Sequence, residues 1–180
     1  MTKFLLSLHV LAAIVAVGPV TVAASMFPPS ARKALAEPGS ERAVAAVRLL
    51  HRICRVYGGV GIAVPVLGFA TAMSMGVLND AWLIVSMLLT ALAAMVLLAL
   101  VLPRQEEILA GLGDTATAAS AGTASSGTAS SVTGTADTAT GTAVDTRATA
   151  RLAMVTGVFN LLWATVTVLM IVRPGSTTGA

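Results

Sequence analysis

Charged residues are scarce in this chain of 180 residues: Asp, Glu, Lys and Arg together make up 11% of it. A soluble globular domain carries about 25% charged residues, which help to cover its surface. Hydrophobic residues make up 56% of the chain, so too few polar residues remain to cover a soluble surface. The scarcity of charge therefore excludes an ordinary soluble domain and favours a chain that lies in a membrane.

Aromatic residues and cysteine are also scarce. Aromatic residues make up 4% of the chain and Cys54 is the single cysteine. Soluble cores normally use large aromatic anchors, whereas membrane helices pack through small residues. A single cysteine excludes an intramolecular disulfide and carries no evidence for an oxidising compartment.

The apolar residues fall in four long blocks, and these predict an all-α fold, a four-helix transmembrane bundle. Each block is long enough to cross a hydrocarbon core of about 30 Å at about 1.5 Å per residue. The predicted spans are residues 4–27, 56–77, 81–102 and 152–172. A cleaved signal peptide is the competing interpretation of the first block, because small residues lie near 23–25. Its apolar region is longer than the 7–15 residues typical of such signals.

Prolines are expected to shape these helices, because proline lacks an N–H and clashes with the preceding turn. Gly18-Pro19 predicts a kink in the first span and Pro65 a bend in the second. Pro28-Pro29 is expected to end the first helix, and Pro103 the third. Ser40 is a candidate N-cap for a helix that leads into the second span.

Residues 111–150 consist almost wholly of Thr, Ala, Ser and Gly, and the triplet Gly-Thr-Ala recurs at Gly122, Gly127, Gly134 and Gly141. Such a segment cannot bury a core, so we expect a disordered insert between helices 3 and 4. The chain then divides into three parts. Residues 1–110 hold helices 1–3 and a basic first loop, 111–150 form the linker, and 151–180 hold helix 4 and a short tail.

Basic residues are concentrated in two loops, which hold nine of the eleven Lys and Arg residues. The positive-inside rule places both loops in the cytoplasm and both termini outside. Arg48, Arg52 and Arg55 recur at the spacing of one helix face. We expect them to contact anionic lipid headgroups, each contact worth about 1 kcal/mol. This explanation of the basic charge leaves no reason to expect a nucleic-acid partner.

A second helix face is built from small residues. Gly68, Ala72 and Gly76 repeat at four-residue spacing in the second span. This small-xxx-small pattern lets two helix backbones approach closely, so it predicts a helix-packing face. The partner helix can belong to the same chain or to a homo- or hetero-oligomer.

His9 is the main candidate for chemistry, because a polar residue within a span is a functional hypothesis by default. It could ligate haem or a metal, or it could be an interfacial imidazole bonded to water or a carbonyl. His51 lies among arginines near the other membrane surface, so we expect it on a solvated face. With Cys54 it makes at most half a zinc site.

The remaining polar residues favour packing over catalysis. Thr156 and Asn160 are expected to hydrogen-bond between helices, although a polar lining for a small solute is the alternative. No Asp, Glu, Lys or Arg lies deep within a predicted span, and Glu106-Glu107 is expected to be a solvated pair. No phosphate-binding loop, nucleophile elbow or zinc motif is present in the sequence.

Three segments are characteristic: Leu8-His9-Val10-Leu11-Ala12-Ala13-Ile14 with Gly18-Pro19, the basic entry to the second span, and Met170-Ile171-Val172-Arg173-Pro174-Gly175. With these segments the chain resembles a family of bacterial integral membrane proteins grouped as domain of unknown function 2269, which implies a multi-pass protein of a bacterial cell membrane. The resemblance covers residues 1–110 and 150–175 and implies the fold but no activity. A weaker similarity, carried by His9, runs to copper-resistance and haem-associated membrane proteins whose first helix begins with Leu-His. It implies haem or copper binding.

Three functions follow as hypotheses. The first is a non-enzymatic membrane protein that acts by helix packing or partner binding. The second is a haem- or metal-binding redox component that uses His9. The third is a small-solute permease.

Deletion of residues 114–146 tests the expectation that the insert is a spacer. We expect membrane insertion and thermal stability to stay unchanged, because the deleted residues cannot contribute to a core. Expression level and melting temperature in detergent measure this. A lower melting temperature or a loss of expression would show that the insert supports the fold.

Overall fold

The computed structural model describes residues 2–37, 39–124 and 135–174, and every regular element in these ranges is helical. The elements are α1 (Thr2–Ala36), α2 (Glu41–Val60), α3 (Ala63–Met75), α4 (Ala81–Met95), the π-helix η1 (Val96–Val101), α5 (Leu102–Ala124) and α6 (Thr135–Val172). The predicted all-α class is confirmed for the described residues.

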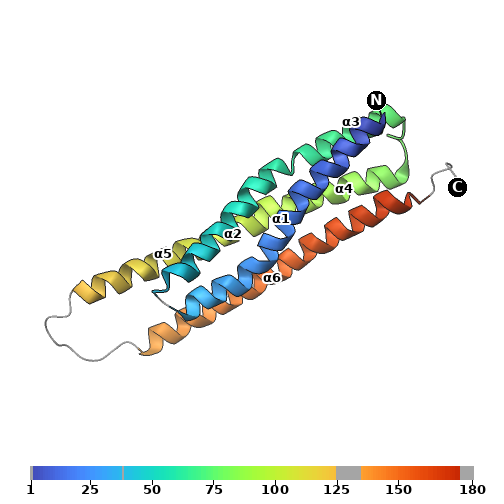
Figure 1. Ribbon diagram of the computed structural model, residues 1–180. Coiled ribbons are helices and arrows are strands. Elements are labelled where there is room, and N and C mark those ends of the chain that lie inside the picture. The colour runs from blue at the N-terminus through green and yellow to red at the C-terminus, as the bar shows by residue number, and fades with distance from the viewer. Residues whose placement is uncertain (1, 38, 125–134, 175–180) are drawn as a thin grey trace.

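These elements form long rods that lie side by side (Figure 1). α2 and α3 are consecutive sections of one rod, and α4, η1 and α5 are consecutive sections of another. α1 packs along α2 and α3, whereas α6 packs along α4, η1 and α5; contacts of α1 with α6 and of α2 with α5 join the two pairs. Within the described ranges, four segments are long and apolar enough to cross a membrane: Thr2–Ala36, Glu41–Met75, Ala81–Asp114 and Arg147–Val172.

Local chemistry explains where several helices begin and end. The Ser40 side chain accepts a hydrogen bond from the Ala43 N–H at 3.4 Å, which confirms the predicted N-cap of α2. α3 ends at Gly76, whose φ of +70° is a left-handed conformation that suits glycine. α4 begins after Asp80, whose carboxylate accepts a hydrogen bond from the Trp82 indole at 3.0 Å.

Pro65 explains why α2 and α3 are separate helices. The proline ring would clash with the carbonyl four residues earlier, which belongs to Gly61. That carbonyl instead accepts a hydrogen bond from the Val64 N–H at 3.1 Å. The bend predicted at Pro65 is therefore a break in the helix at Gly61 and Ile62.

The prediction that Pro103 ends the third helix is wrong, because α5 continues through it to Ala124. The π-helix η1 lies directly before this proline, and the Leu102 N–H bonds to the Leu97 carbonyl five residues back. The wider π turn relieves the contact between the proline ring and the preceding carbonyls, so the chain can stay helical.

The predicted stop at Pro28-Pro29 is also wrong, because α1 continues to Ala36. Neither proline has an N–H, so the carbonyls of Ala24 and Ser25 lose their usual helical donors. Phe27 and Pro28 are buried against neighbouring helices. Packing against these helices holds the segment helical despite the local preference of the prolines.

The main core lies where α1, α2, η1, α5 and α6 meet, near the turn between α1 and α2. Its largest completely buried apolar side chains are Phe27, Phe159, Leu152, Val47 and Val101. The other ends of the rods are held by smaller contacts, among them the cluster of Ala72, Trp82 and Leu83.

The insert is helical at both flanks. α5 extends into it as far as Ala124, α6 begins at Thr135, and Leu112 and Thr149 are buried. The sequence predicts disorder over all of residues 111–150. Of these, 111–124 and 135–150 are helical, and 125–134 lie outside the described residues, as do residues 175–180 of the tail.

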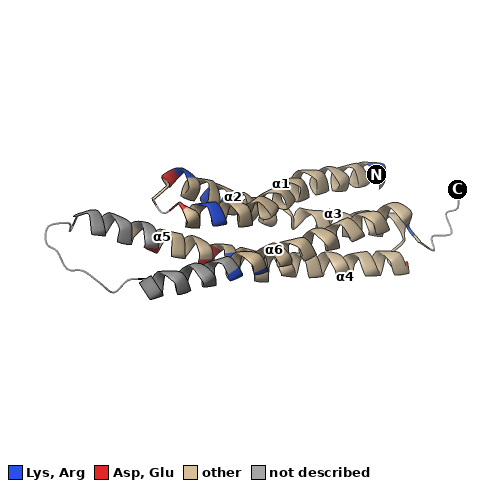
Figure 2. Ribbon diagram, turned by 90° about the horizontal axis from the view of Figure 1, so that it is seen from below, with Lys and Arg blue, Asp and Glu red and all other residues tan. Residues whose placement is uncertain are grey.

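Basic residues gather around the turn between α1 and α2, and others lie on α6 just beyond the stretch drawn in grey (Figure 2). The start of α1, with Lys3, and the end of α6, followed by Arg173, lie at the opposite end. The described basic residues of the two predicted loops therefore lie towards the same end of the rods.

Candidate functional site

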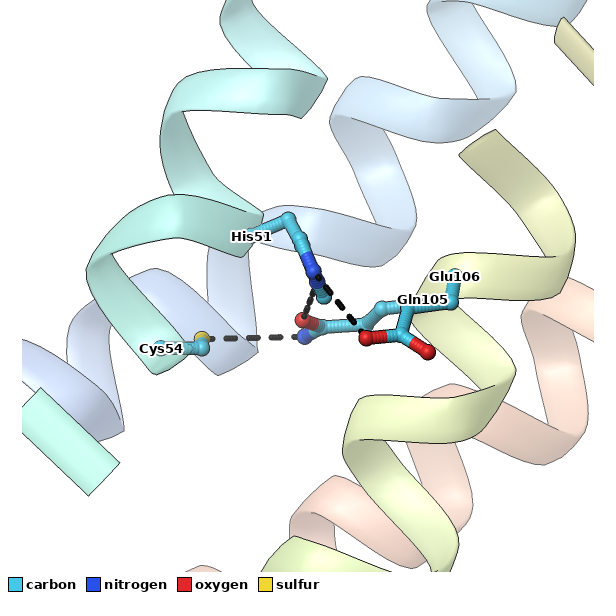
Figure 3. Close-up of polar contacts among 4 residues, drawn as sticks. All are labelled: His51, Cys54, Gln105 and Glu106. Carbon is cyan, nitrogen blue, oxygen red and sulfur yellow. Dashed lines mark hydrogen bonds and ion pairs between the residues drawn. The ribbon is translucent and has the colours of Figure 1, made fainter. Parts of the chain in front are cut away.

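The largest polar cluster joins α2 to α5 near the basic end of the rods. Figure 3 shows His51 and Cys54 on one side of α2, with the Gln105 side chain reaching between them from α5. The His51 Nδ1–H donates to Gln105 Oε1 at 3.1 Å, and Gln105 Nε2 donates to Cys54 Sγ at 3.6 Å. Gln105 and Cys54 are completely buried. A single amide side chain therefore ties two residues of α2 to α5.

The orientation of Gln105 determines the state of the His51 ring. Because Gln105 offers its carbonyl oxygen, His51 must carry a proton on Nδ1. The other ring nitrogen, Nε2, lies 3.7 Å from Glu106 Oε1. An ion pair with Glu106 forms when Nε2 is protonated as well. Since the Glu106 side chain is 58% exposed, this pair is screened by solvent and contributes little stability.

The prediction that His51 lies on a solvated face is wrong, because its side chain is 12% exposed. The helix spacing placed it next to the arginines, but its ring turns towards α5. Among the described residues, no group of three or more His, Cys, Asp and Glu side chains is placed to hold a metal. The buried thiol and amide hold the helices together and are closed to a soluble substrate.

The His9 side chain extends from α1 towards α3 and is buried. Its Nδ1–H donates to the Val64 carbonyl at 3.0 Å. A Cβ built on Gly68 would lie 2.9 Å from His9 Cε1. Only glycine at position 68 therefore lets the ring pack this closely against the α3 backbone.

The two histidines lie in different parts of the molecule. His9 contacts α3, whereas Cys54, one turn after His51, packs against Ala23 and Ala24 of α1. Ala23 lies fourteen positions after His9 on α1, which corresponds to about 21 Å along a helix. His9 and His51 are therefore not placed to hold one shared centre.

The other predicted site residues lie as follows. Arg48, Arg52 and Arg55 are all exposed on α2. Of the small-residue set on α3, Gly68 contacts His9 and Ala72 is buried beside Trp82. A Cβ added at Gly76 would meet nothing within 4 Å, and this glycine serves as the end of α3.

Asn160 links α6 to α1, since its Nδ2 donates to Ser25 Oγ at 3.0 Å. Thr156, one turn earlier on α6, is buried, but its hydroxyl has no hydrogen-bond partner. Both residues line a groove beside Pro28, Pro29 and Arg32.

The sequence singles out neither Gln105 nor this groove. Gln105 stands between Arg104 and Glu106, where nothing in the sequence distinguishes it from solvated neighbours. Arg32 is one of several charges in the first loop. Each becomes notable through contacts with residues far away in the sequence.

No family model, curated protein or solved structure matches this chain. The resemblance of both chain ends to domain of unknown function 2269 stays a prediction.

Substitution of Gly68 by Ala tests the packing of His9. We expect Gly68→Ala to cost about 1–2 kcal/mol of stability, because the new methyl group forces the ring away from Val64. The same change in a His9→Ala background should cost much less, since the clash is gone. Thermal unfolding in detergent measures all four proteins.

Gly59→Ala is the matched control, because nothing lies within 4 Å of a Cβ at Gly59. It should be neutral or slightly stabilising, as alanine is the better helix former. Equal costs of Gly68→Ala with and without His9 would refute the proposed contact.

Replacement of Gln105 by Leu tests the cluster between α2 and α5. Gln105→Leu should cost about 1–2 kcal/mol, because it leaves the His51 N–H without its partner in a nearly buried position. The double variant with His51→Leu should recover part of the loss, since no unpaired polar group remains. Glu106→Gln should change stability by less than about 0.5 kcal/mol.

The same thermal unfolding assay applies. A Gln105→Leu protein as stable as the Glu106→Gln protein would mean that the cluster contributes nothing to the fold.

Proposed function

We propose that the chain is an integral membrane protein without enzymatic activity, which acts by helix packing and by binding a partner within the bilayer. The observation that supports this most is the difference between the interior, where polar side chains bond one helix to another, and the surface, which is largely apolar. His9, His51, Gln105 and Asn160 all make hydrogen bonds between helices. The side chains that chemistry would need are thus engaged in holding the bundle together.

The outer surface of the rods is apolar, which supports a location in lipid. Large hydrophobic side chains are exposed on α1, α2, α3, α4 and α6, for example Ile14, Met73, Leu88 and Leu161. In water such a surface would aggregate, whereas in a bilayer it faces acyl chains or another helix. These four residues belong to the four described segments that are long and apolar enough to cross a membrane.

The proposed orientation places the basic end in the cytoplasm of a bacterial cell and both termini outside, as the positive-inside rule requires. Arg48, Arg52 and Arg55 are exposed near this end, where they would meet anionic lipid headgroups. A homo- or hetero-oligomer within the membrane is compatible with this orientation.

A haem- or metal-binding redox component that uses His9 is the alternative. One observation favours it: ligating imidazoles commonly donate their second N–H to a backbone carbonyl, as His9 does to Val64. The fit of haem is nevertheless poor. The ring is buried and packs against the α3 backbone at Gly68, so a macrocycle would have to separate α1 from α3.

Photo-crosslinking in native membranes tests the proposed partner. A photoreactive residue is placed in turn at Ile14, Met73, Leu88 and Leu161, all of which are exposed, with buried Val166 as the control position. A partner occupies one side of the bundle, so we expect a discrete protein adduct from some of the exposed positions. An adduct of twice 18.1 kDa indicates a second copy, and another mass indicates a different protein.

Lipid adducts alone, formed equally at all four exposed positions, would contradict partner binding. A protein adduct of equal yield from Val166 would show that the chain had unfolded rather than bound a partner.

An absorption spectrum of the detergent-purified protein, oxidised and reduced, tests the alternative beside His9→Ala. We expect both proteins to lack a Soret band, because the His9 ring is occupied in packing. A Soret band that disappears in the variant would make His9 a haem ligand and replace the proposal with a redox or haem-handling function.

A further inference from the structure

A groove of about 350 Å³ lies between α1 and α6. One wall is formed by α1 around Pro28 and Pro29, and the other by α6 around Gly157. The prolines lack N–H groups, so the carbonyls of Ala24 and Ser25 lose their usual helical donors, and Gly157 has no side chain that could fill the groove. The lining residues are Ser25, Pro28, Pro29, Arg32, Ala153, Thr156, Gly157 and Asn160.

Two polar atoms in the groove are buried without a partner, Thr156 Oγ1 and Asn160 Oδ1. Helical threonines in this chain usually donate to the carbonyl four residues earlier, as Thr165 and Thr167 do. Thr156 makes no such bond although it is 2% exposed. A buried hydroxyl without a partner is unfavourable, so the unpaired hydroxyl of Thr156 indicates that a ligand binds in the groove.

Arg32 supplies a positive charge at one end of the same groove. Its Nε–H donates to Thr149 Oγ1 at 3.4 Å. The Nη groups make no ion pair with a described Asp or Glu side chain. Their N–H donors remain available for a phosphate, which a guanidinium binds through paired hydrogen bonds.

We propose that this groove binds one anionic diacyl phospholipid, with its phosphate at Arg32 and an ester group at Thr156. The spacing fits this occupant. Thr156 lies seven residues beyond Thr149 on α6, about 10 Å along the helix towards the bilayer centre. A ligand that reaches both levels is charged at one end and less polar at the other, as a phospholipid is.

The surroundings of the groove favour a lipid over a soluble anion. The exposed neighbours Met26 and Leu161 are apolar, and they would flank acyl chains. The proposal needs the bilayer location argued above but does not depend on partner binding. It also differs from the expected headgroup contacts of Arg48, Arg52 and Arg55, which lie on α2 and line no part of this groove.

Native mass spectrometry of the full chain in detergent tests the site, with dioleoyl phosphatidylglycerol and dioleoyl phosphatidylcholine as probes. We expect one tightly bound phosphatidylglycerol per chain and at least about tenfold weaker binding of phosphatidylcholine, whose ammonium group competes with Arg32. Arg32→Gln should weaken phosphatidylglycerol about tenfold, the effect of losing a charge-assisted hydrogen bond. Arg42→Gln is the matched control, because Arg42 is exposed on α2, lines no part of the groove and is outside the set expected to contact headgroups; it should leave this affinity unchanged.

Thr156→Val separates binding from folding. It should weaken phosphatidylglycerol several-fold, while the melting temperature without lipid stays unchanged or rises because an unpaired buried hydroxyl has been removed. This variant keeps the test decisive even if Arg32→Gln fails to fold.

Four results would overturn the proposal: an unchanged affinity of Thr156→Val, an equal loss in Arg42→Gln, equal binding of the two lipids, or displacement of the lipid by soluble glycerol phosphate. The last result would indicate a site for a soluble phosphate instead.

Discussion

The backbone hydrogen bonds of helices in apolar surroundings are the constraint on which this structure depends. Water cannot replace a lost bond there, so each proline within a helix must be accommodated by the chain itself. Three proline sites do so in different ways. Pro65 coincides with a break at Gly61 and Ile62, Pro103 follows a π-helix, and Pro28-Pro29 stays helical within α1 and lies beside a groove. The irregular features of the bundle are therefore the places where prolines remove donors.

The same constraint accounts for the polar side chains inside the bundle. The His9 imidazole donates to the Val64 carbonyl in α3, just after the break before Pro65. Gln105, two residues beyond Pro103, connects His51 and Cys54. Such contacts orient one helix on another because an apolar contact alone has little directional preference. In a membrane, where the hydrophobic effect does not drive helices together, they and the close approach at Gly68 supply much of the specificity.

The exterior carries a different set of features. An apolar lateral surface surrounds the rods, the basic residues gather at one end, and the groove between α1 and α6 runs from that end towards the apolar middle. A lipid seated in this groove would complete the hydrogen bonding of Thr156 and fill the space left beside the prolines. The polar groups that face one another on α1 and α6 would then serve both the packing of these helices and the binding of a lipid.

The sequence by itself determined the local features. Runs of apolar residues predicted the helices that are long enough to span a membrane. Ser40 predicted the N-cap of α2, and Pro65 predicted the bend between α2 and α3. Each of these features depends on residues within a few positions of one another. Only the tertiary structure decided that the helices continue through Pro28-Pro29 and Pro103, that His51 turns inwards, and that Gln105 is buried. The deciding contacts join residues 51–135 positions apart. No local pattern encodes such pairs, since they arise only when the helices pack.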